Sequence, residues 1–421
     1  MTEYFYAITN SSFQDIKLQN LSLIILWPQK TAPEIEESQF SYQFCRETSY
    51  KLCLHSFPDT KWIEYSEENF PLEMFTGISP ETKILYIGDP EIILAPKAIS
   101  KMINSMENRQ SACGPVFNTS LNQFQKADLP WTYFNIESYL ETADIMAEKK
   151  SELMIATHSL DPSCILYNGL FFKKTLSTIK SNNRKLKQEI SHTIPFFIEK
   201  NALIHRFGDY YHFNDRKELI QLIPQKTKEV LDVGCAMGMY GKRLKKVRPD
   251  IYLAGVEKNP EMAAYARKYY DDIHVGNIET VSFKTKFDLI NCGELLEHLV
   301  NPWKVLKHFN TILKPDGYLV LSIPNAGHWS IVMELAQGNH QYLPSGLNCI
   351  SHLRWFTEPS ICDTLGANGF KIDVLTRRTL PPTLKAETFI RTMAGSGFGN
   401  ERSLRTSEFI IRAIKIKNII Q

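Results

Sequence analysis

The chain has 421 residues, of which 43% are hydrophobic and 22% are charged, and its formal net charge is +2 at pH 7. This near-neutral balance argues against a nucleic-acid-binding protein that works through bulk charge, and the length predicts two domains. The apolar runs are too short to span a bilayer, and no basic segment leads into an apolar core at the N-terminus, so we expect no signal peptide. The eight cysteines form no C-x-x-C pair, which favours reduced thiols in a cytoplasmic protein.

The first half of the chain alternates short apolar segments with stretches of helical pattern. We expect strands at 21–27, 83–88, 112–117 and 164–167, a helix at 40–53, and a turn followed by a helix over 92–103. Strands that alternate with helices predict an α/β domain. We place its end near residue 205, so that the domains span 1–205 and 206–421.

Two acids follow the strand expected at 83–88, in the run Asp89-Pro90-Glu91. Residues 20–205 loosely resemble the GT-A glycosyltransferases of family 2, in which a D-x-D at a strand end holds a metal on a nucleotide-sugar diphosphate. Asp89 and Glu91 stand at those positions, but D-P-E departs from the motif and no catalytic base is evident. The resemblance implies a degenerate domain that docks an acceptor or a partner, such as a glycan-assembly enzyme. Two solvated acids at a strand end are the simpler interpretation.

The second half is organised around residues 228–238, K-E-V-L-D-V-G-C-A-M-G. An apolar strand that turns through Gly234 and Gly238 into a helix lets backbone N–H groups approach a ligand closely. Glu257 stands about twenty residues later, at the end of the next expected strand, 251–256. A carboxylate there can accept hydrogen bonds from both hydroxyls of a ribose.

With the run F-D-L-I-N-C-G-E-L-L-E-H-L at 287–299, this glycine turn resembles motif I of the class I S-adenosylmethionine (SAM)-dependent methyltransferases. The resemblance implies a seven-stranded Rossmann-like sheet whose last strand, 408–415, is antiparallel, and SAM as the cofactor. In that family an Asp that bonds the adenine amino group usually stands where Asn277 is found. The residues that we expect at the cofactor are Asp232, Gly234, Cys235, Gly238, Glu257, Lys258, Asn277, Ile278, Glu294 and Tyr211, the last with Arg216 in a segment that folds over the cofactor.

A long insertion follows the fifth strand and is rich in His, Trp, Tyr and Arg, which favours a functional loop. Its runs S-I-P-N-A-G-H, G-N-H-Q-Y and H-L-R-W-F-T resemble a methyltransferase subgroup associated with glycosyltransferases of surface-glycan pathways. The resemblance implies a sugar or glycan-linked acceptor, with Arg354, Trp329 and Tyr342 as acceptor-binding residues. Cys349 and Ile350 stand where that subgroup carries an Asp-Arg pair. We expect residues 381–406 to form a mobile loop.

Methyl transfer to a hydroxyl needs a general base with a pKa near neutral, which suits histidine. His298 is our first choice, and His352 and His328 are alternatives; each is also explained by a structural role. We see no ligand cluster for a metal. Three other functions stay open: methylation of a quinone-like or other small hydroxylated metabolite, a bifunctional enzyme with an active glycosyltransferase half, and a non-catalytic SAM-binding scaffold.

Overall fold

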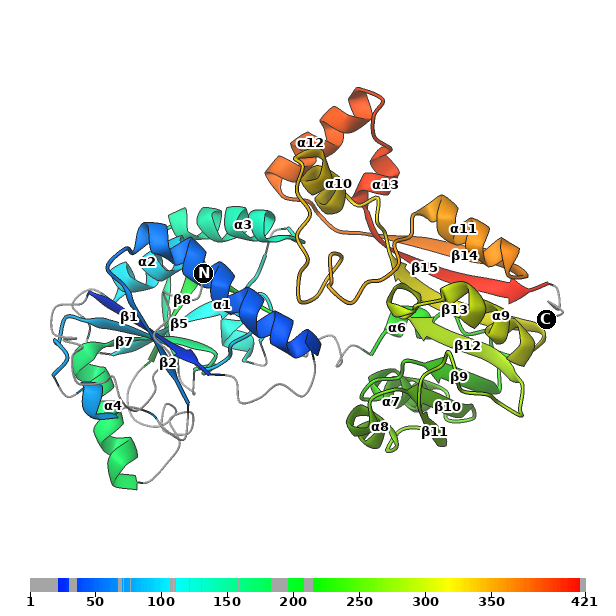
Figure 1. Cartoon of the computed structure of the whole chain (residues 1–421), viewed down its shortest axis with the longest axis horizontal. Coiled ribbons are helices and arrows are strands. Elements are labelled where there is room, and N and C mark those ends of the chain that lie inside the picture. The colour runs from blue at the N-terminus through cyan, green and yellow to red at the C-terminus, as the bar shows by residue number, and fades with distance from the viewer. Residues whose placement is uncertain are drawn as a thin grey trace. The chain divides into compact units, whose positions relative to one another are not determined.

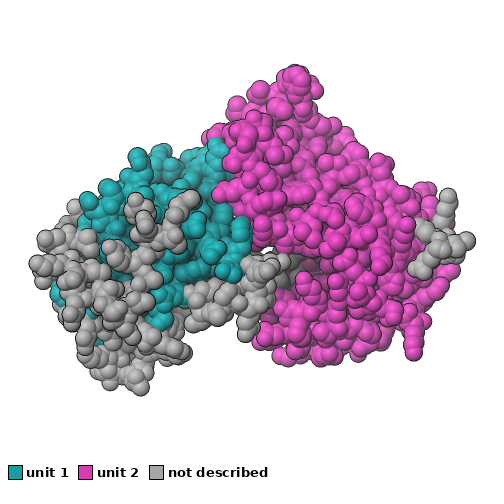
Figure 2. Space-filling view, in the orientation of Figure 1, with its two compact units in different colours: residues 1–208 teal, residues 209–421 magenta. Residues whose placement is uncertain are grey.

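The computed structural model describes residues 22–29, 36–66, 70, 72–75, 77–106, 109, 111–120, 122–129, 131–156, 160–182, 196–207 and 215–416. The chain divides into two compact units, residues 1–208 and 209–421, which Figure 2 shows in different colours. The sequence placed the boundary near residue 205. Each unit is described by itself.

The N-terminal unit is built on a mixed sheet. Over its described residues the strand order is β2-β1-β3-β7-β5-β8-β4, with β6 paired to β8. The strands are β1 (Leu23–Pro28), β2 (Lys61–Tyr65), β3 (Lys83–Ile87), β4 (Ile92–Ile93), β5 (Ala112–Phe117), β6 (Leu153–Ala156), β7 (Cys164–Asn168) and β8 (Phe196–Arg206). The helices are α1 (Glu36–Ser56), α2 (Pro96–Ser105), α3 (Ile136–Glu148) and α4 (Gly169–Asn182), with 3-10 turns η3 (Leu72–Phe75) and η4 (Gln123–Gln125).

Strand direction in this unit brings several strand ends to one edge. β1 pairs in parallel with β2 and β3, β7 is antiparallel to β3 and β5, and β5 is parallel to β8. The carboxyl ends of β3, β5 and β8 therefore share an edge with the amino end of β7. Asp89 and Arg206 lie at that edge.

Strand β8 was not predicted from the sequence, because its centre is polar. The run Glu199-Lys200-Asn201 interrupts the apolar pattern of this segment. In the structure Glu199 is fully buried. Its carboxylate accepts hydrogen bonds from the hydroxyls of Ser105 and Ser151 and from the backbone N–H of Glu152. A buried acid that is hydrogen-bonded in this way is tolerated inside a strand.

The C-terminal unit is built on one sheet with the order β11-β10-β9-β12-β13-β15-β14 (Figure 1). Its strands are β9 (Glu229–Val233), β10 (Tyr252–Glu257), β11 (Asp272–Val275), β12 (Phe287–Gly293), β13 (Leu313–Pro324), β14 (Phe370–Thr379) and β15 (Thr406–Lys415). Its helices are α6 (Lys217–Ile220), α7 (Met239–Val247), α8 (Pro260–Ala266), α9 (Pro302–Ile312), α10 (Trp329–Ala336), α11 (Glu358–Ala367), α12 (Leu384–Gly395) and α13 (Glu401–Arg405), with a 3-10 turn η6 (Leu296–His298). Neighbours from β11 to β13 run parallel, whereas β15 is antiparallel to β13 and β14. The expected α/β, Rossmann-like sheet is confirmed.

Side-chain alternation along the strands divides the core of this unit between two faces. Val230 and Leu253 pack on the face that α6, α7 and α8 cover, whereas Leu231 and Val233 pack on the face that α9 and α11 cover. Because helices cover both faces, a polar side chain on a central strand is enclosed. Ligand access is left to the loops at the carboxyl edge of the strands.

The prediction of a mobile loop at 381–406 was wrong. The segment contains α12 and α13, which gather with α10 beside the sheet (Figure 1). Ala386 and Ile390 on α12 are fully buried, so packing stabilises the helix. Gly395 is the last residue of α12, and Gly397 follows with a φ of +78°, the conformation in which glycine commonly ends a helix.

Candidate active site

The glycine turn after β9 needs its glycines. Gly234 has a φ of +77° and Gly238 a φ of +83°, which are left-handed conformations that glycine adopts at little cost. A Cβ on Gly238 would lie 2.8 Å from the Cα of Ala266. Gly234 is exposed, and its N–H donates to the carbonyl of Val256 at 2.9 Å. The turn is held against β10 and presents accessible backbone at the sheet edge.

Glu257 lies beside this turn at the end of β10, because β9 and β10 pair Val233 with Val256. Its Oε2 accepts from the N–H of Ala236 at 2.9 Å, and its Oε1 accepts from the N–H of Asn259 at 2.8 Å. An ionised carboxylate has about four acceptor positions. Glu257 is half-buried, so it both holds the glycine turn and can accept hydroxyls from a bound ribose.

Two residues expected at the cofactor lie in the core instead. Asp232 is 3% exposed, and its carboxylate accepts from the Tyr270 hydroxyl at 2.5 Å and the Asn291 amide at 2.7 Å. Burial raises the pKa of Asp232 to about 6. Cys235 is 5% exposed, and burial raises the pKa of its thiol. Asp232 thus links β9 to β12 and to Tyr270, and we leave both residues out of the proposed cofactor contacts.

The remaining expected cofactor residues are spread along the same edge. Asn277 is exposed, and its side-chain oxygen accepts from the N–H of Glu279 at 3.0 Å, so the amide that we expected to face adenine also caps its own turn. Ile278 is buried and Lys258 is exposed. Tyr211 lies outside the described residues.

Glu294 follows β12 at the centre of the edge, with a φ of +50°. Its Oε1 accepts from the Ser322 hydroxyl at 3.0 Å. Arg216, at the start of α6, donates to the same Ser322 hydroxyl and forms an ion pair with Glu408 at 2.5 Å. Burial, and then repulsion by Glu408, raises the pKa of Glu294. A polar network therefore joins β12, β13 and β15, and sequence reasoning missed Glu408 because nothing local marks its role.

Two histidines meet where the loop after β12 contacts the insertion. The ring centroids of His298 and His352 are 4.9 Å apart. The Nδ1 of His298 lies 3.1 Å from the carbonyl of Ser351, and the Nδ1 of His352 lies 2.9 Å from the carbonyl of Leu347. Burial, and then the charge of His298, lowers the pKa of His352 to about 4. The structure thus brings together two of the three candidate bases.

The third candidate base, His328, is a buried residue that caps a helix. It is 1% exposed, caps the N-terminus of α10 by accepting from the N–H of Ser330, and has its pKa lowered to about 3 by burial. Trp329 is also buried, at 1% exposure. Neither side chain is placed to meet a diffusing acceptor, so we leave both out of the proposed site.

The other two predicted acceptor residues lie nearer the surface. Tyr342 is 44% exposed, and its ring contacts that of His340, which in turn contacts Trp355. Arg354 donates to the carbonyls of Leu353 and Val300, so it joins the insertion to the loop after β12. Trp355 contacts His352 as well. It stands inside the H-L-R-W-F-T run, which is the signal that would have identified it.

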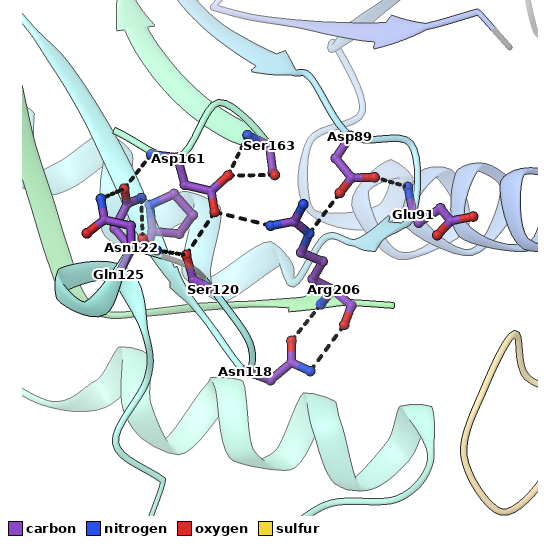
Figure 3. A network of polar contacts seen from close by, with 10 residues as sticks. Asp89, Glu91, Asn118, Ser120, Asn122, Gln125, Asp161, Ser163 and Arg206 are labelled. Atoms are coloured by element: carbon purple, nitrogen blue, oxygen red, sulfur yellow. Dashed lines mark hydrogen bonds and ion pairs between the residues drawn. The ribbon is translucent and has the colours of Figure 1, made fainter. Parts of the chain in front are cut away.

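In the N-terminal unit, the carboxylate of Asp89, the first acid at the D-x-D positions, is bound by protein groups (Figure 3). Asp89 forms an ion pair with Arg206 at 2.8 Å, and its other oxygen accepts from the N–H of Glu91 at 2.9 Å. Arg206 also pairs with Asp161 at 3.2 Å, and Asp161 accepts from the Ser163 hydroxyl at 2.6 Å. A guanidinium thus lies between two carboxylates where the motif would hold a metal.

Throughout the described part of the chain, the helices are all too short or too polar to traverse a bilayer.

The comparisons with known proteins each cover about half of this chain or less. Residues 202–375 match a family model described as a methyltransferase domain. A ubiquinone biosynthesis O-methyltransferase of Actinobacillus pleuropneumoniae is 29% identical over 137 residues, which cover 27% of this chain and 58% of the relative. One from Coxiella burnetii is 28% identical over 139 residues, covering 31% of this chain and 58% of the relative. The chain therefore spans less than two thirds of the length of these relatives.

Among solved structures, a SAM-dependent methyltransferase of Thermotoga maritima, described as a possible histamine N-methyltransferase, is 20% identical with a TM-score of 0.35, covering 49% of this chain and 89% of that chain. The family match, together with the sheet order and the glycine turn, makes the C-terminal unit a class I SAM-dependent methyltransferase domain. The expected cofactor, S-adenosyl-L-methionine, is confirmed for this domain.

Proposed function

We propose that the protein transfers a methyl group from SAM to a hydroxyl oxygen of a sugar or glycan-linked intermediate. One observation carries the proposal: the exposed glycine turn and Glu257 follow the carboxyl ends of β9 and β10, and the paired His298 and His352 lie in the segments that follow the parallel strands β12 and β13. Cofactor and acceptor groups therefore share one edge of the sheet, where ligands bind in open α/β folds. The printed names of the curated relatives support oxygen as the methylated atom.

Some of these residues are proposed to bind the cofactor and others to bind the acceptor. Glu257 accepts the ribose hydroxyls, and the backbone around Gly234 approaches the amino-acid end of the cofactor. Asn277 and Ile278 lie where adenine is expected. The sulfonium of bound SAM supplies the activated methyl group, so the remaining task of the chain is to orient the acceptor and to remove its proton.

His298 is the better placed base of the meeting pair. The carbonyl of Ser351 only accepts, so the Nδ1 of His298 carries the hydrogen and Nε2 is the basic nitrogen. His352 is a weak base, because burial holds its pKa near 4. Arg354 supports the site by fixing the loop after β12.

A second acceptor class, a quinone-like or other small hydroxylated metabolite, is favoured by two observations. The curated relatives are named for ubiquinone biosynthesis. Exposed apolar side chains, including Val300, Leu353 and Trp355, also lie around the histidine pair. An apolar rim suits a hydrophobic acceptor better than a free sugar.

For the N-terminal unit, we propose a degenerate GT-A-like domain over residues 1–205 that docks an acceptor or a glycan-assembly enzyme, followed by the methyltransferase domain over 206–421. The ion pair between Asp89 and Arg206 supports the loss of metal-dependent sugar transfer. Hydrolysis of nucleotide sugars by the wild-type protein that is abolished in Asp89→Asn would instead establish the bifunctional enzyme.

The test of the proposed function has two stages. Calorimetry with S-adenosylhomocysteine should show one site per chain. Incubation with methyl-labelled SAM and separate panels of nucleotide sugars, reducing sugars and hydroxylated aromatics should then yield a labelled product whose mass identifies the acceptor. Failure to bind S-adenosylhomocysteine would refute the proposal, whereas binding without turnover on any panel would favour a scaffold.

A further inference from the structure

Three side chains with metal-binding groups meet beside the proposed active site. Among the described residues, one donor atom from each of Glu297, His298 and His352 lies within 4.8 Å of those of the other two. Glu297 and His298 belong to η6, whereas His352 comes from the insertion. Because the third residue is distant in sequence, spacing alone did not reveal the cluster, and we had expected no metal in this half.

The main chain holds these segments together. The N–H groups of Leu353 and Arg354 both donate to the carbonyl of Glu297, at 2.8 and 3.0 Å. The positions of Glu297 and His352 are thus set by backbone hydrogen bonds. Donor groups that are held in place before a metal binds lose little conformational entropy when it does.

Both imidazoles are oriented as metal ligands usually are. Each Nδ1 faces a backbone carbonyl, that of Ser351 for His298 and that of Leu347 for His352. A carbonyl cannot donate, so in each neutral ring Nδ1 carries the hydrogen and Nε2 has the lone pair. Such a hydrogen bond to the second nitrogen typically fixes the tautomer of a metal-bound histidine.

The side chain of Glu297 supplies the independent indication of a ligand. Glu297 is 0% exposed, and neither oxygen of its carboxylate has a hydrogen-bond partner among the described residues. An ionised carboxylate buried without a partner is strongly disfavoured. A cation held between this carboxylate and the two histidines removes that cost. The alternative way to avoid the cost is for the carboxyl group of Glu297 to stay protonated.

We propose that Glu297, His298 and His352 bind one divalent transition-metal ion, of the class of Zn²⁺ or Mn²⁺. Two imidazoles with one carboxylate suit these ions better than Mg²⁺ or Ca²⁺, which prefer oxygen ligands. Donor atoms around such an ion are about 3.4 Å apart, so no pair of these donor atoms has to approach by more than about 1.4 Å on binding. Three protein ligands leave coordination positions open for a substrate oxygen.

The role of this ion rests on the proposed function. When an acceptor hydroxyl coordinates the ion, its pKa falls and its proton leaves to solvent. The oxygen then forms a bond to the methyl carbon as the carbon–sulfur bond breaks, and S-adenosylhomocysteine is released as a neutral thioether. The two histidines act as ligands in this scheme, so the ion replaces His298 as the group that activates the acceptor hydroxyl, while the transfer of methyl from SAM to oxygen is unchanged.

Metal binding is tested on the full chain independently of turnover. Protein stripped with a chelator is titrated with Zn²⁺, Mn²⁺ or Mg²⁺ alone in the calorimeter, and its metal content is measured after desalting. The wild type should bind one equivalent of Zn²⁺ or Mn²⁺ and bind Mg²⁺ more weakly. Glu297→Gln and His352→Asn should each weaken binding at least tenfold, whereas the control His340→Asn, on an exposed histidine of the same insertion, should not.

S-adenosylhomocysteine binding, measured in parallel, separates this inference from the proposed function. Loss of metal with cofactor binding retained in His352→Asn supports the inference even where Glu297→Gln does not fold. A wild type that binds S-adenosylhomocysteine but no transition metal overturns it, as does equal metal binding in all variants. If the wild type binds no transition metal and Glu297→Gln is nevertheless stable, the buried carboxyl of Glu297 is protonated instead of metal-bound. Metal binding without cofactor binding would instead refute the proposed function.

Discussion

Asp232 shows how burial decides what a residue of a sequence motif does. It stands just before the glycine turn, yet strand alternation directs its side chain to the face covered by α7 and α8, opposite to that of Leu231 and Val233. There it accepts hydrogen bonds from Tyr270 and Asn291. Its position next to the turn was readable in the sequence, but its partners were not, because Tyr270 and Asn291 come from other elements.

The raised pKa of Asp232 predicts a pH-dependent stability. In the unfolded chain the carboxyl titrates near 3.8, and in the folded protein near 6. Between these values the folded state binds more protons, so stability falls as pH rises from about 4 to 6. At about 1.4 kcal/mol per pKa unit, the loss is about 3 kcal/mol. Asp232→Asn lacks this titration. Between pH 4 and 7, the free energy of unfolding of the variant minus that of the wild type, measured with urea, should therefore increase by about 3 kcal/mol. A difference that does not change with pH would contradict the assignment.

Glu257 is the residue on which cofactor affinity should depend most. Glu257→Gln keeps the size of the side chain but replaces an acceptor oxygen with a donor group, so it weakens the hydrogen bonds to ribose and to the N–H of Ala236. We expect S-adenosylhomocysteine to bind at least tenfold more weakly by calorimetry. The matched control is Glu261→Gln, on the exposed first turn of α8, which should bind as wild type does. Equal affinity in Glu257→Gln would remove the ribose contact from the proposal.

The residue types of the proposed catalytic site were predictable from the sequence, but the way these residues meet in space was not. A histidine in the E-L-L-E-H loop and another in the insertion are visible in the sequence, but their meeting depends on the backbone bonds between Glu297 and residues 353 and 354. His328 looked equivalent to them until its position as the cap of α10 was known. Glu297 itself reads as a surface charge, because only tertiary packing buries it.

At the scale of elements, two separate features of the glycine turn require glycine at position 238. Its φ is +83°, and a Cβ there would press on the backbone of α8. Gly346 in the insertion has a φ of +86°, with nothing within 4 Å of the corresponding Cβ position. The two positions therefore separate the cost of backbone strain from the cost of a steric clash.

Substitution by alanine at both positions measures that difference. Gly346→Ala should lose about 1–2 kcal/mol from left-handed strain alone. Gly238→Ala should lose more, by about 1–3 kcal/mol, because the clash forces α7 and α8 apart. Urea unfolding of both variants, with the transition of the C-terminal unit identified by its shift on adding S-adenosylhomocysteine, checks the order. Equal losses would show that the turn relaxes without moving α8.

Elements with a continuous apolar pattern were predictable, and elements stabilised by distant partners were not. Val230, Leu231 and Val233 made β9 evident, and Ala112–Phe117 was expected with the bounds that β5 has. Strand β8 was missed because the serines that bond Glu199 lie outside the strand. Helix α12 was missed because the glycines at its end and just beyond it, Gly395, Gly397 and Gly399, suggested a loop, whereas the buried Ile390 shows that packing stabilises the helix.

At the scale of the whole molecule, each unit has its own hydrophobic core. The N-terminal core is a single cluster, and the C-terminal core is divided between the two faces of its sheet. Every described residue that we assign to the cofactor or the acceptor lies within residues 209–421. The two-domain organisation was predictable from length and from the two series of strands and helices, but the ion pairing of Asp89 was not.

This separation predicts that the C-terminal unit binds its cofactor alone. A fragment of residues 209–421 should bind S-adenosylhomocysteine within about threefold of the full chain, since no proposed cofactor contact is removed. Calorimetry on both proteins checks this, with circular dichroism to establish that the fragment is folded. In the full chain, Asp89→Asn should likewise leave the affinity unchanged. A folded fragment that does not bind would assign part of the cofactor site to residues 1–208.

The carbonyl of Glu297 joins the insertion to the loop after β12, whereas the glycine turn follows β9 and Glu257 ends β10, on the side of β9 away from β12. In the proposed site, the insertion contributes to the acceptor side and none of the residues proposed for the cofactor lies in it, so we expect that it can be exchanged without loss of cofactor binding. Grafting residues 325–357 from a relative of known acceptor preference should transplant that preference.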